Sequence, residues 1–168
     1  MDFLKNLGIL DTPPDTRIDA VTRAAADYFR VPIALLTLID SDNQWVKSNT
    51  SVIDFQASRN NSFCHHTIQR LRLLVVENAL DDPRFCDNPM VRNPPHIRFY
   101  AGAPLVVGGR YRLGSLCLVD DIPRSLDAEE RSHLWQFAVT ASQIIEELYM
   151  SQAATDPGMR PLPTRRYS

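Results

Sequence analysis

Apolar residues recur at helical spacing in the segment that follows two prolines near the start of the chain. The apolar positions are Ile18, Val21, Ala24, Ala25, Tyr28 and Phe29, and the opposite face holds Asp19, Arg23 and Asp27. Pro13 and Pro14 precede this segment and Pro32 follows it. Because proline fits a helix start but interrupts a helix interior, the pattern predicts one amphipathic helix that ends before Pro32.

The segments that follow this helix have the apolar content of strands. Residues 33–39 (IALLTLI) form an unbroken apolar run, which is typical of a strand that is covered on both faces. The turn-forming residues 40–43 separate this run from a neighbouring strand at 44–49, and a third strand is predicted at 73–77. Two further strands, 97–105 and 113–120, flank the Gly108-Gly109 dipeptide. Glycine takes a positive φ without a Cβ clash, so these two strands are predicted to form a tight hairpin.

The connection between the third strand and the hairpin contains helix-capping and turn-forming residues. Asp82 precedes Pro83, a combination that predicts a short helix with Asp82 as its cap and Pro83 in its first turn. Asp87, Asn88 and Pro89 are expected to end this helix.

The last apolar pattern predicts a long C-terminal helix. Asp127 and Glu130 have the spacing of a capping box. The main apolar stripe consists of Leu134, Phe137, Ala138, Ala141, Ile144, Ile145 and Leu148. A thinner second stripe contains Trp135 and Val139. Periodicity stops after Ser151, so the sequence predicts one domain over residues 1–150 and a disordered polar tail over 151–168.

Composition narrows the class of protein. The 168 residues suffice for one domain with a substantial core. A formal net charge of −2 provides no basic field, so nucleic acid is not expected as a partner. The N-terminal region lacks a long apolar run, and neither a signal peptide nor a membrane span is expected. Three widely spaced cysteines favour reduced thiols in the cytoplasm over a disulfide framework.

The start of the predicted hairpin combines a cation with a phenol. Arg98 and Tyr100 alternate on one strand, so their side chains are expected on the same face at the mouth of an apolar sheet. A few polar groups on an apolar wall are typical of a small-molecule site, and Arg98 could bind an anionic group. The alternative for Arg98 is an ion pair with one of three carboxylates, those of Asp81, Asp82 and Asp87.

The Cys64-His65-His66 sequence allows two interpretations. One is a metal site or a Cys–His nucleophile, with Cys64 activated at a helix N-terminus behind Ser62. However, adjacent residues point in divergent directions and no CxxC or HxxxH spacing occurs, so no metal site is expected. The other interpretation is that Ser62 caps a short helix whose side chains contribute to packing.

Several motifs, taken in order, resemble the GAF domain family. They are residues 7–14 (LGILDTPP), 40–47 (DSDNQWVK), Ser62-Phe63-Cys64 with His66, 82–85 (DPRF) with 87–89 (DNP), IRFYAGAPL and LGSLCLVD. The resemblance extends from Leu7 to Leu148 and is strongest to bacterial GAF sensor modules found with diguanylate cyclases and histidine kinases.

This resemblance implies an α/β fold of the α+β type. A central antiparallel sheet of five to six strands would carry the terminal helices on one face and a loop-covered pocket on the other. Phe63 and Cys64 would pack inward, His66 would line the cavity, and the segment before the hairpin would form a lid. The candidate ligand-binding residues are Trp45, Phe63, Cys64, His66, Phe85, Asn88, Arg98 and Tyr100. Neither the ligand nor any cofactor is identified by these motifs.

The resemblance further implies a cytoplasmic, small-molecule-sensing regulatory domain that acts in signal transduction and not by turning over a substrate. Related GAF domains commonly continue into an effector, whereas this sequence ends in a polar tail, so no effector domain of its own is expected and a signalling partner could act in trans. One alternative is a free methionine-R-sulfoxide reductase, although such enzymes carry a reactive thiol where residues 96–100 have none. Another is a protein-interaction module whose pocket is filled by its own side chains.

Pairing of two copies is also expected. Related GAF domains often dimerise through terminal helices, and Trp135 and Val139 with Phe3, Leu4 and Leu7 could form such an interface. The alternative is that Trp135 folds back over the N-terminal segment of its own chain.

Overall fold

A computed structural model describes residues 14–39, 44–53, 55, 63–109, 111–155 and 158. The elements, in chain order, are α2 (Thr16–Phe29), β1 (Ile33–Ile39), β2 (Gln44–Asn49), α3 (Phe63–Thr67), β3 (Leu74–Val76), the 3-10 helix η2 (Ala79–Asp81), α4 (Pro89–Arg92), β4 (Phe99–Val107), β5 (Tyr111–Asp120) and α5 (Ala128–Thr155). The predicted turn at 40–43, the Ser62 cap, the 7–13 part of the first motif and the apolar residues Phe3, Leu4 and Leu7 lie outside the described residues.

The five described strands form one antiparallel sheet in the order β2-β1-β5-β4-β3. The predicted hairpin is confirmed: β4 and β5 pair along their length, and Gly108 and Gly109 between them have φ values of 63° and 74°. The apolar β1 lies inside the sheet between β2 and β5, as its unbroken run of apolar residues predicts. The α+β fold class is therefore confirmed.

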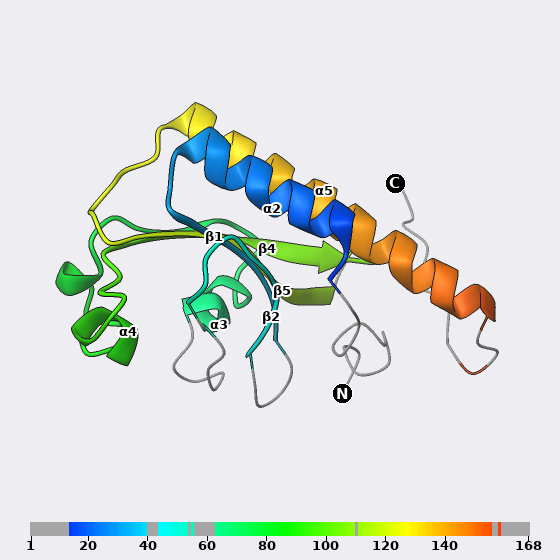
Figure 1. Ribbon diagram of the computed structural model, residues 1–168, viewed down its shortest axis with the longest axis horizontal. Helices are drawn as coiled ribbons and strands as arrows, with labels where there is room; N and C mark the ends of the chain where they lie inside the picture. Colours follow the sequence, from blue (N-terminus) through cyan, green and yellow to red (C-terminus); the bar gives the residue numbers. More distant parts are fainter. Residues whose placement is uncertain are drawn as a thin grey trace.

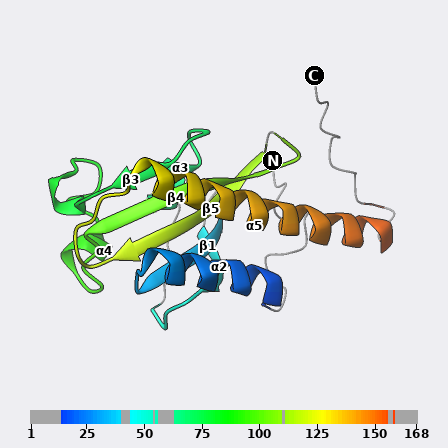
Figure 2. The same ribbon diagram turned by 90° about the horizontal axis from the view of Figure 1, so that it is seen from above.

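Helices α2 and α5 lie side by side over one face of the sheet (Figures 1 and 2). The Asp15 carboxylate caps α2 by accepting from the backbone N–H groups of Arg17 and Ile18. In α5, Asp127 and Glu130 exchange backbone-to-carboxylate hydrogen bonds of 3.1 and 2.8 Å, which confirms the predicted capping box. The helix runs to Thr155, five residues past the predicted domain end at 150.

The core beneath these helices is apolar, and we call it the helix-side core. Its fully buried members include Ile18, Ala25, Leu36, Leu38, Phe99, Ala101, Leu105, Leu116, Leu118, Leu134 and Ile145. It joins alternate residues of β1, β4 and β5 to the inner faces of both helices. The stability of the domain therefore has its largest apolar contribution on this face.

The opposite face of the sheet carries α3, η2, α4 and their connecting turns (Figure 1). A second cluster lies there, the loop-side core, which consists of Ile33, Leu35, Ile39, Phe55, Phe63, Cys64, Ile68, Val76, Ala79, Phe85, Val91, Ile97, Tyr100, Cys117 and Val119. It is built from many short segments, and it includes four of the eight predicted ligand-binding residues, namely Phe63, Cys64, Phe85 and Tyr100.

The predicted helix at Asp82–Pro83 is wrong. Residues 82–88 form turns, in which the Asp82 carboxylate accepts from the Arg84 backbone N–H and also binds the Arg84 guanidinium. The helix begins later, at α4, with Asn88 as its cap and Pro89 in its first turn. Asn88 therefore starts a helix instead of ending one, because its amide oxygen accepts from the Met90 backbone N–H at 2.8 Å.

Candidate functional site

An aromatic cluster lies between α3 and the sheet. The ring of Phe63 stacks on Phe85 with centroids 4.2 Å apart and on Tyr100 at 5.0 Å, and His66 meets the edge of Phe85 at 4.9 Å. Phe63, Phe85 and Tyr100 are all at most 6% exposed. These residues come from α3, a turn and β4, and the structure brings them together as the sequence suggested. Their rings pack on each other and fill this part of the loop-side core.

A buried group of hydroxyls and thiols adjoins the aromatic cluster, and we call it the thiol–hydroxyl cluster. The Tyr100 hydroxyl lies 2.8 Å from the Thr67 hydroxyl and donates to Cys64 Sγ at 3.4 Å. The Ser115 hydroxyl lies 3.4 Å from that of Tyr100 and 3.4 Å from that of Thr37. The Sγ atoms of Cys64 and Cys117 are 3.9 Å apart. Thus Tyr100 is 1% exposed inside the protein and does not stand at the mouth of a pocket.

Hydrogen bonds decide the acidity of this cluster. The Cys117 thiol, followed by the hydroxyls of Ser115, Thr37 and Tyr100, lowers the pKa of Cys64 to about 6, although burial acts in the opposite direction. The same contact with Cys64, together with burial, raises the pKa of Cys117 well above the usual thiol value. Burial also raises the pKa of the Tyr100 hydroxyl. These hydrogen bonds therefore favour a thiolate on Cys64 over one on Cys117.

The surroundings of His66 favour the neutral form of its imidazole. Burial, followed by the charges of His65 and Arg84, lowers the pKa of its imidazole. Arg84 also lies over the Phe85 ring, with its guanidinium carbon 5.1 Å from the centroid. The Arg84 guanidinium thus covers the Phe85 ring of the aromatic cluster.

The Arg98 side chain forms hydrogen bonds with backbone carbonyl groups on the loop side. Its guanidinium donates to the carbonyl oxygens of Val91 and Ile97, each at 3.0 Å, and so connects the end of α4 to the segment that enters β4. Of the acidic partners considered from the sequence, Asp82 pairs with Arg84 at 2.7 Å and Asp87 with Arg92 at 3.2 Å. Arg98 precedes β4, and its role in the structure is to hold α4 in place.

Two predicted site residues lie apart from the aromatic cluster. Trp45 pairs with Leu38 across β1 and β2 and packs against the helix-side core, on the other face of the sheet. Asn88 is the cap of α4, as described above. Thr37, Thr67, Ser115 and Cys117 belong to the thiol–hydroxyl cluster but were absent from the predicted site. The alternation of side chains along β5 could have indicated Ser115 and Cys117, because two residues that are two positions apart on a strand face the same side of the sheet.

A cleft of about 400 Å³ lies on the loop side, at the ends of β1 and β5. Its lining residues are Pro32, Ile33, Ser51, Val52, Ile53, Pro95, Ile97, Val119, Asp120 and Asp121. Ile33, Ile97 and Val119 belong to the loop-side core, so the floor of the cleft is continuous with that core. Asp120 is buried and bound by Arg124, whereas the carboxylate of Asp121 is exposed. The cleft is therefore mainly apolar with an acidic rim.

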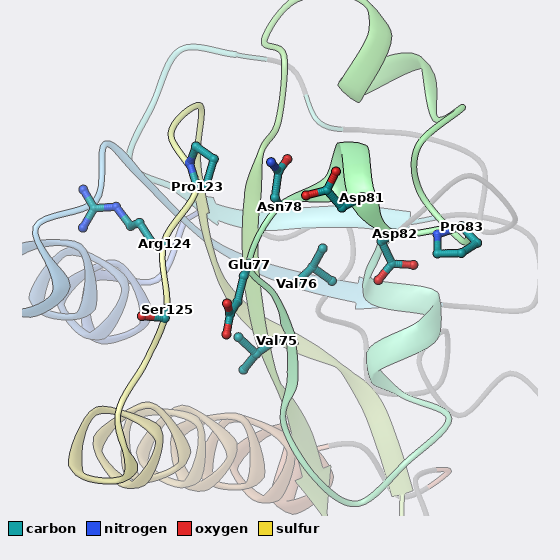
Figure 3. A pocket seen from close by; sticks show the side chains of 10 residues that line it. All are labelled: Val75, Val76, Glu77, Asn78, Asp81, Asp82, Pro83, Pro123, Arg124 and Ser125. Carbon is teal, nitrogen blue, oxygen red and sulfur yellow. The ribbon is translucent and has the colours of Figure 1, made fainter.

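A second hollow, of about 680 Å³, lies along β3 at the edge of the sheet (Figure 3). Glu77, Asn78, Asp81 and Asp82 line one part of it, and residues 123–125 line another. Figure 3 shows the Arg124 side chain directed away from the acidic residues. Its guanidinium binds the carbonyl oxygens of Phe29 and Arg30 at the end of α2. This hollow is consequently acidic and more open than the apolar cleft.

Within the described ranges, no group of three or more His, Cys, Asp or Glu side chains is arranged to hold a metal ion. A helix long and apolar enough to cross a membrane is likewise not found among the residues described.

Comparison with known proteins decides the family. The GAF domain family matches residues 13–145, most of the chain. The protein belongs to the GAF domain family. A cyclic di-GMP phosphodiesterase of Pseudomonas aeruginosa is 40% identical over 127 residues, which are 76% of this chain and 22% of that protein. The chain thus spans about a fifth of the length of this curated relative.

Solved structures agree with this GAF fold. The PixJ GAF domain of Thermosynechococcus elongatus, in its blue-light-absorbing form, has a TM-score of 0.66 at 14% identity and covers 90% of this chain and 91% of that one. The GAF domain of an Acinetobacter phosphoenolpyruvate-protein phosphotransferase gives 0.66 at 16%, covering 89% and 96%. A type II free methionine-R-sulfoxide reductase from Thermoplasma acidophilum gives 0.66 at 9%, covering 79% and 92%. At these identities the likeness concerns the fold alone.

Proposed function

We propose that this GAF domain is a cytoplasmic, non-catalytic sensor that binds a small molecule in the apolar cleft at the ends of β1 and β5. The carrying observation is the cleft itself, whose volume of about 400 Å³ suits a small molecule. Ile33, Ile97 and Val119 would contact an apolar body. The exposed Asp121 would accept from a donor or cationic group on the same ligand.

The cleft is placed where ligand binding could change the structure. One wall is formed by residues 51–53, which precede α3 in the chain, and another by Pro95 and Ile97, which follow α4. Ile97 also donates its backbone N–H to the Met90 carbonyl of α4 at 2.8 Å. A ligand that moves Ile97 would therefore act on α4 directly, and such differential contact is what a sensor requires.

The regulated output in this proposal is cyclic di-GMP turnover, carried out in trans or by another part of a longer polypeptide. Its support is the 40% identity to a domain-sized part of a protein named as a cyclic di-GMP phosphodiesterase. The proposed cytoplasmic location is supported by the three cysteines, none of which forms a disulfide in the described part of the chain, although the Sγ atoms of Cys64 and Cys117 are only 3.9 Å apart.

Native mass spectrometry of the freshly purified chain tests the binding site. We expect a small molecule to co-purify with the wild type and to be lost from Ile53→Trp, because the indole would occupy the cleft. Leu71→Trp is the matched control: Leu71 is 65% exposed in the turn after α3, so the ligand should be retained. The proposal would be contradicted if the wild type showed only the mass of the polypeptide, or if the bound small molecule were equally present in Ile53→Trp.

One observation favours an enzyme instead. The acidic Cys64 thiol beside Cys117 could reduce free methionine-R-sulfoxide, as the reductase alternative requires. Incubation with free methionine-R-sulfoxide and a dithiol reductant tests this alternative. Turnover by the wild type that disappears in Cys64→Ser would show that the protein is a reductase and would contradict the proposed non-catalytic sensor. We expect no turnover.

The sensor is also proposed to act as a homodimer through α5. Val139 is 39% and Met150 52% exposed, and eleven residues, about three helical turns, separate them on one side of the helix. Trp135, four residues before Val139, is half-buried beside them. Sedimentation should give a dimer for the wild type and a monomer for Val139→Glu, and a monomeric wild type would refute this interface.

A further inference from the structure

Two cysteines that are 53 positions apart in the chain meet in the thiol–hydroxyl cluster. Cys64 belongs to the short helix α3 and Cys117 to the central strand β5, and neither forms a disulfide. Their Sγ atoms are 3.9 Å apart, and the two residues are 3% and 0% exposed. A disulfide bond is about 2.05 Å long, so closure requires an approach of about 2 Å.

We propose that Cys64 and Cys117 are a peroxide-reactive dithiol, which a hydroperoxide converts into an intramolecular disulfide between α3 and β5. Strand β5 is hydrogen-bonded to β1 on one side and to β4 on the other, and it cannot shift without disturbing the sheet. Helix α3 has only five residues and rests on the loop-side core. The approach is therefore made by α3.

The surrounding groups assign different roles to the two thiols. Cys64 Sγ accepts the Tyr100 hydroxyl and faces the Cys117 thiol, and these hydrogen bonds stabilise a thiolate at Cys64. The pKa of Cys64 accordingly lies below its ordinary value and that of Cys117 above it. Cys64 is thus assigned as the attacking thiolate and Cys117 as the resolving thiol.

The chemistry balances with one hydroperoxide per disulfide. The Cys64 thiolate attacks one peroxide oxygen, the O–O bond breaks, and the leaving oxygen departs as hydroxide or alkoxide and takes up a proton. Cys64 is then a sulfenic acid. Cys117 loses its proton and attacks the Cys64 sulfur, the S–O bond breaks, and the hydroxyl leaves as water. Two electrons pass from the thiols to the peroxide, and an external dithiol restores the reduced pair.

Disulfide formation would change the loop side of the domain. It replaces the thiolate that accepts from the Tyr100 hydroxyl by a disulfide sulfur, a weaker acceptor, and draws α3 inward, together with Phe63 and His66 on the same helix. These two side chains contact Phe85, so the turn that leads to α4 must adjust as well. Oxidation therefore acts on the elements that a ligand in the apolar cleft would move.

Thiol counting and peptide mapping after hydrogen peroxide treatment of the full chain test the proposal. The wild type should lose two of its three denatured-state thiols and the mass of two hydrogen atoms, with Cys64 and Cys117 linked in one peptide pair. Cys86→Ser is the matched control and should form the same link, because Cys86 lies in the turn between η2 and α4. Loss of only the Cys86 thiol, a link between chains, or three remaining thiols would overturn it.

A second variant keeps the proposal testable if cysteine replacements fail to fold. Tyr100→Phe removes the hydroxyl that donates to Cys64 while retaining the ring. We expect the pH profile for reaction of the wild type with hydrogen peroxide to have its midpoint below that of an ordinary thiol, and to shift upward in Tyr100→Phe. Identical profiles in the two proteins would show that the cluster does not activate Cys64.

Discussion

The two faces of the sheet differ in what they bury. The helix-side core is made of apolar side chains that two long, capped helices cover. The loop-side core buries hydroxyls and thiols beneath short elements, the longest helix of which is the five-residue α3. Unpaired buried polar groups each cost about 1–3 kcal/mol, and among the described residues every buried side-chain nitrogen or oxygen has a partner. We therefore expect the helix-side core to contribute most of the stability of the domain. The loop-side core contains a polar network that can rearrange on ligand binding or oxidation.

Two glycines provide the sharpest test of this difference. A Cβ at Gly114 would lie 1.9 Å from the Thr37 carbonyl oxygen, a backbone atom of a neighbouring central strand. A Cβ at Gly102 would lie 2.4 Å from the Tyr100 hydroxyl and 2.7 Å from that of Thr67, which are side-chain atoms of the loop side. We expect Gly114→Ala to destabilise the protein by about 3 kcal/mol or more and Gly102→Ala by less, measured by urea unfolding. Equal losses would mean that the loop side is as rigid as the sheet.

Two neighbouring leucines of β1 compare the faces with the same chemistry. Leu36 is 0% exposed in the helix-side core and Leu35 is 3% exposed in the loop-side core. Truncation leaves a cavity whose cost depends on how well the surroundings collapse. We predict about 3–5 kcal/mol for Leu36→Ala and about 2–3 kcal/mol for Leu35→Ala, measured by chemical denaturation. A larger cost for Leu35→Ala would reverse the comparison.

A pH-dependent contribution from the loop side should be small. Hydrogen bonds from Arg84 lower the pKa of Asp82 below its usual 3.8, and the Arg84 side chain of this ion pair is 40% exposed to solvent. Because the folded state has the lower pKa, the stabilisation is complete above about pH 4 and is lost as the pH falls through the folded-state value. Asp82→Asn should therefore cost about 0.5 kcal/mol at pH 7, and this cost should shrink as the pH falls below about 4. A constant difference across this range would contradict the assignment.

The fold could be predicted from the sequence because its signals are local. Periodicity in α2 and α5, the capping box at Asp127 and the Gly108-Gly109 turn each specify backbone structure within a few residues. The dipeptide Asn88-Pro89 also contained a helix-start signal, although it was interpreted as a helix end.

The site was harder to predict because the burial of a side chain depends on the tertiary fold and not on its neighbours in the sequence. Alternation correctly places a side chain on one face, but it cannot say that Tyr100 is 1% exposed or that Trp45 packs on the helix side. Thr37 lies within an otherwise apolar run of the sequence, and its place in the thiol–hydroxyl cluster is recognised only from its contact with Ser115. The Cys64–Cys117 contact joins two segments that only the tertiary fold brings together.

Native-state amide hydrogen exchange tests the contrast between the faces most directly. The amides of β1, β4, β5 and the part of α5 over the sheet should exchange only through global unfolding. Those of α3 and α4 should exchange through local openings that leave the sheet intact, and should therefore report a lower opening free energy. If α3 and α4 exchange as slowly as β5, the loop side is not the responsive face, and the contrast between the two faces is wrong.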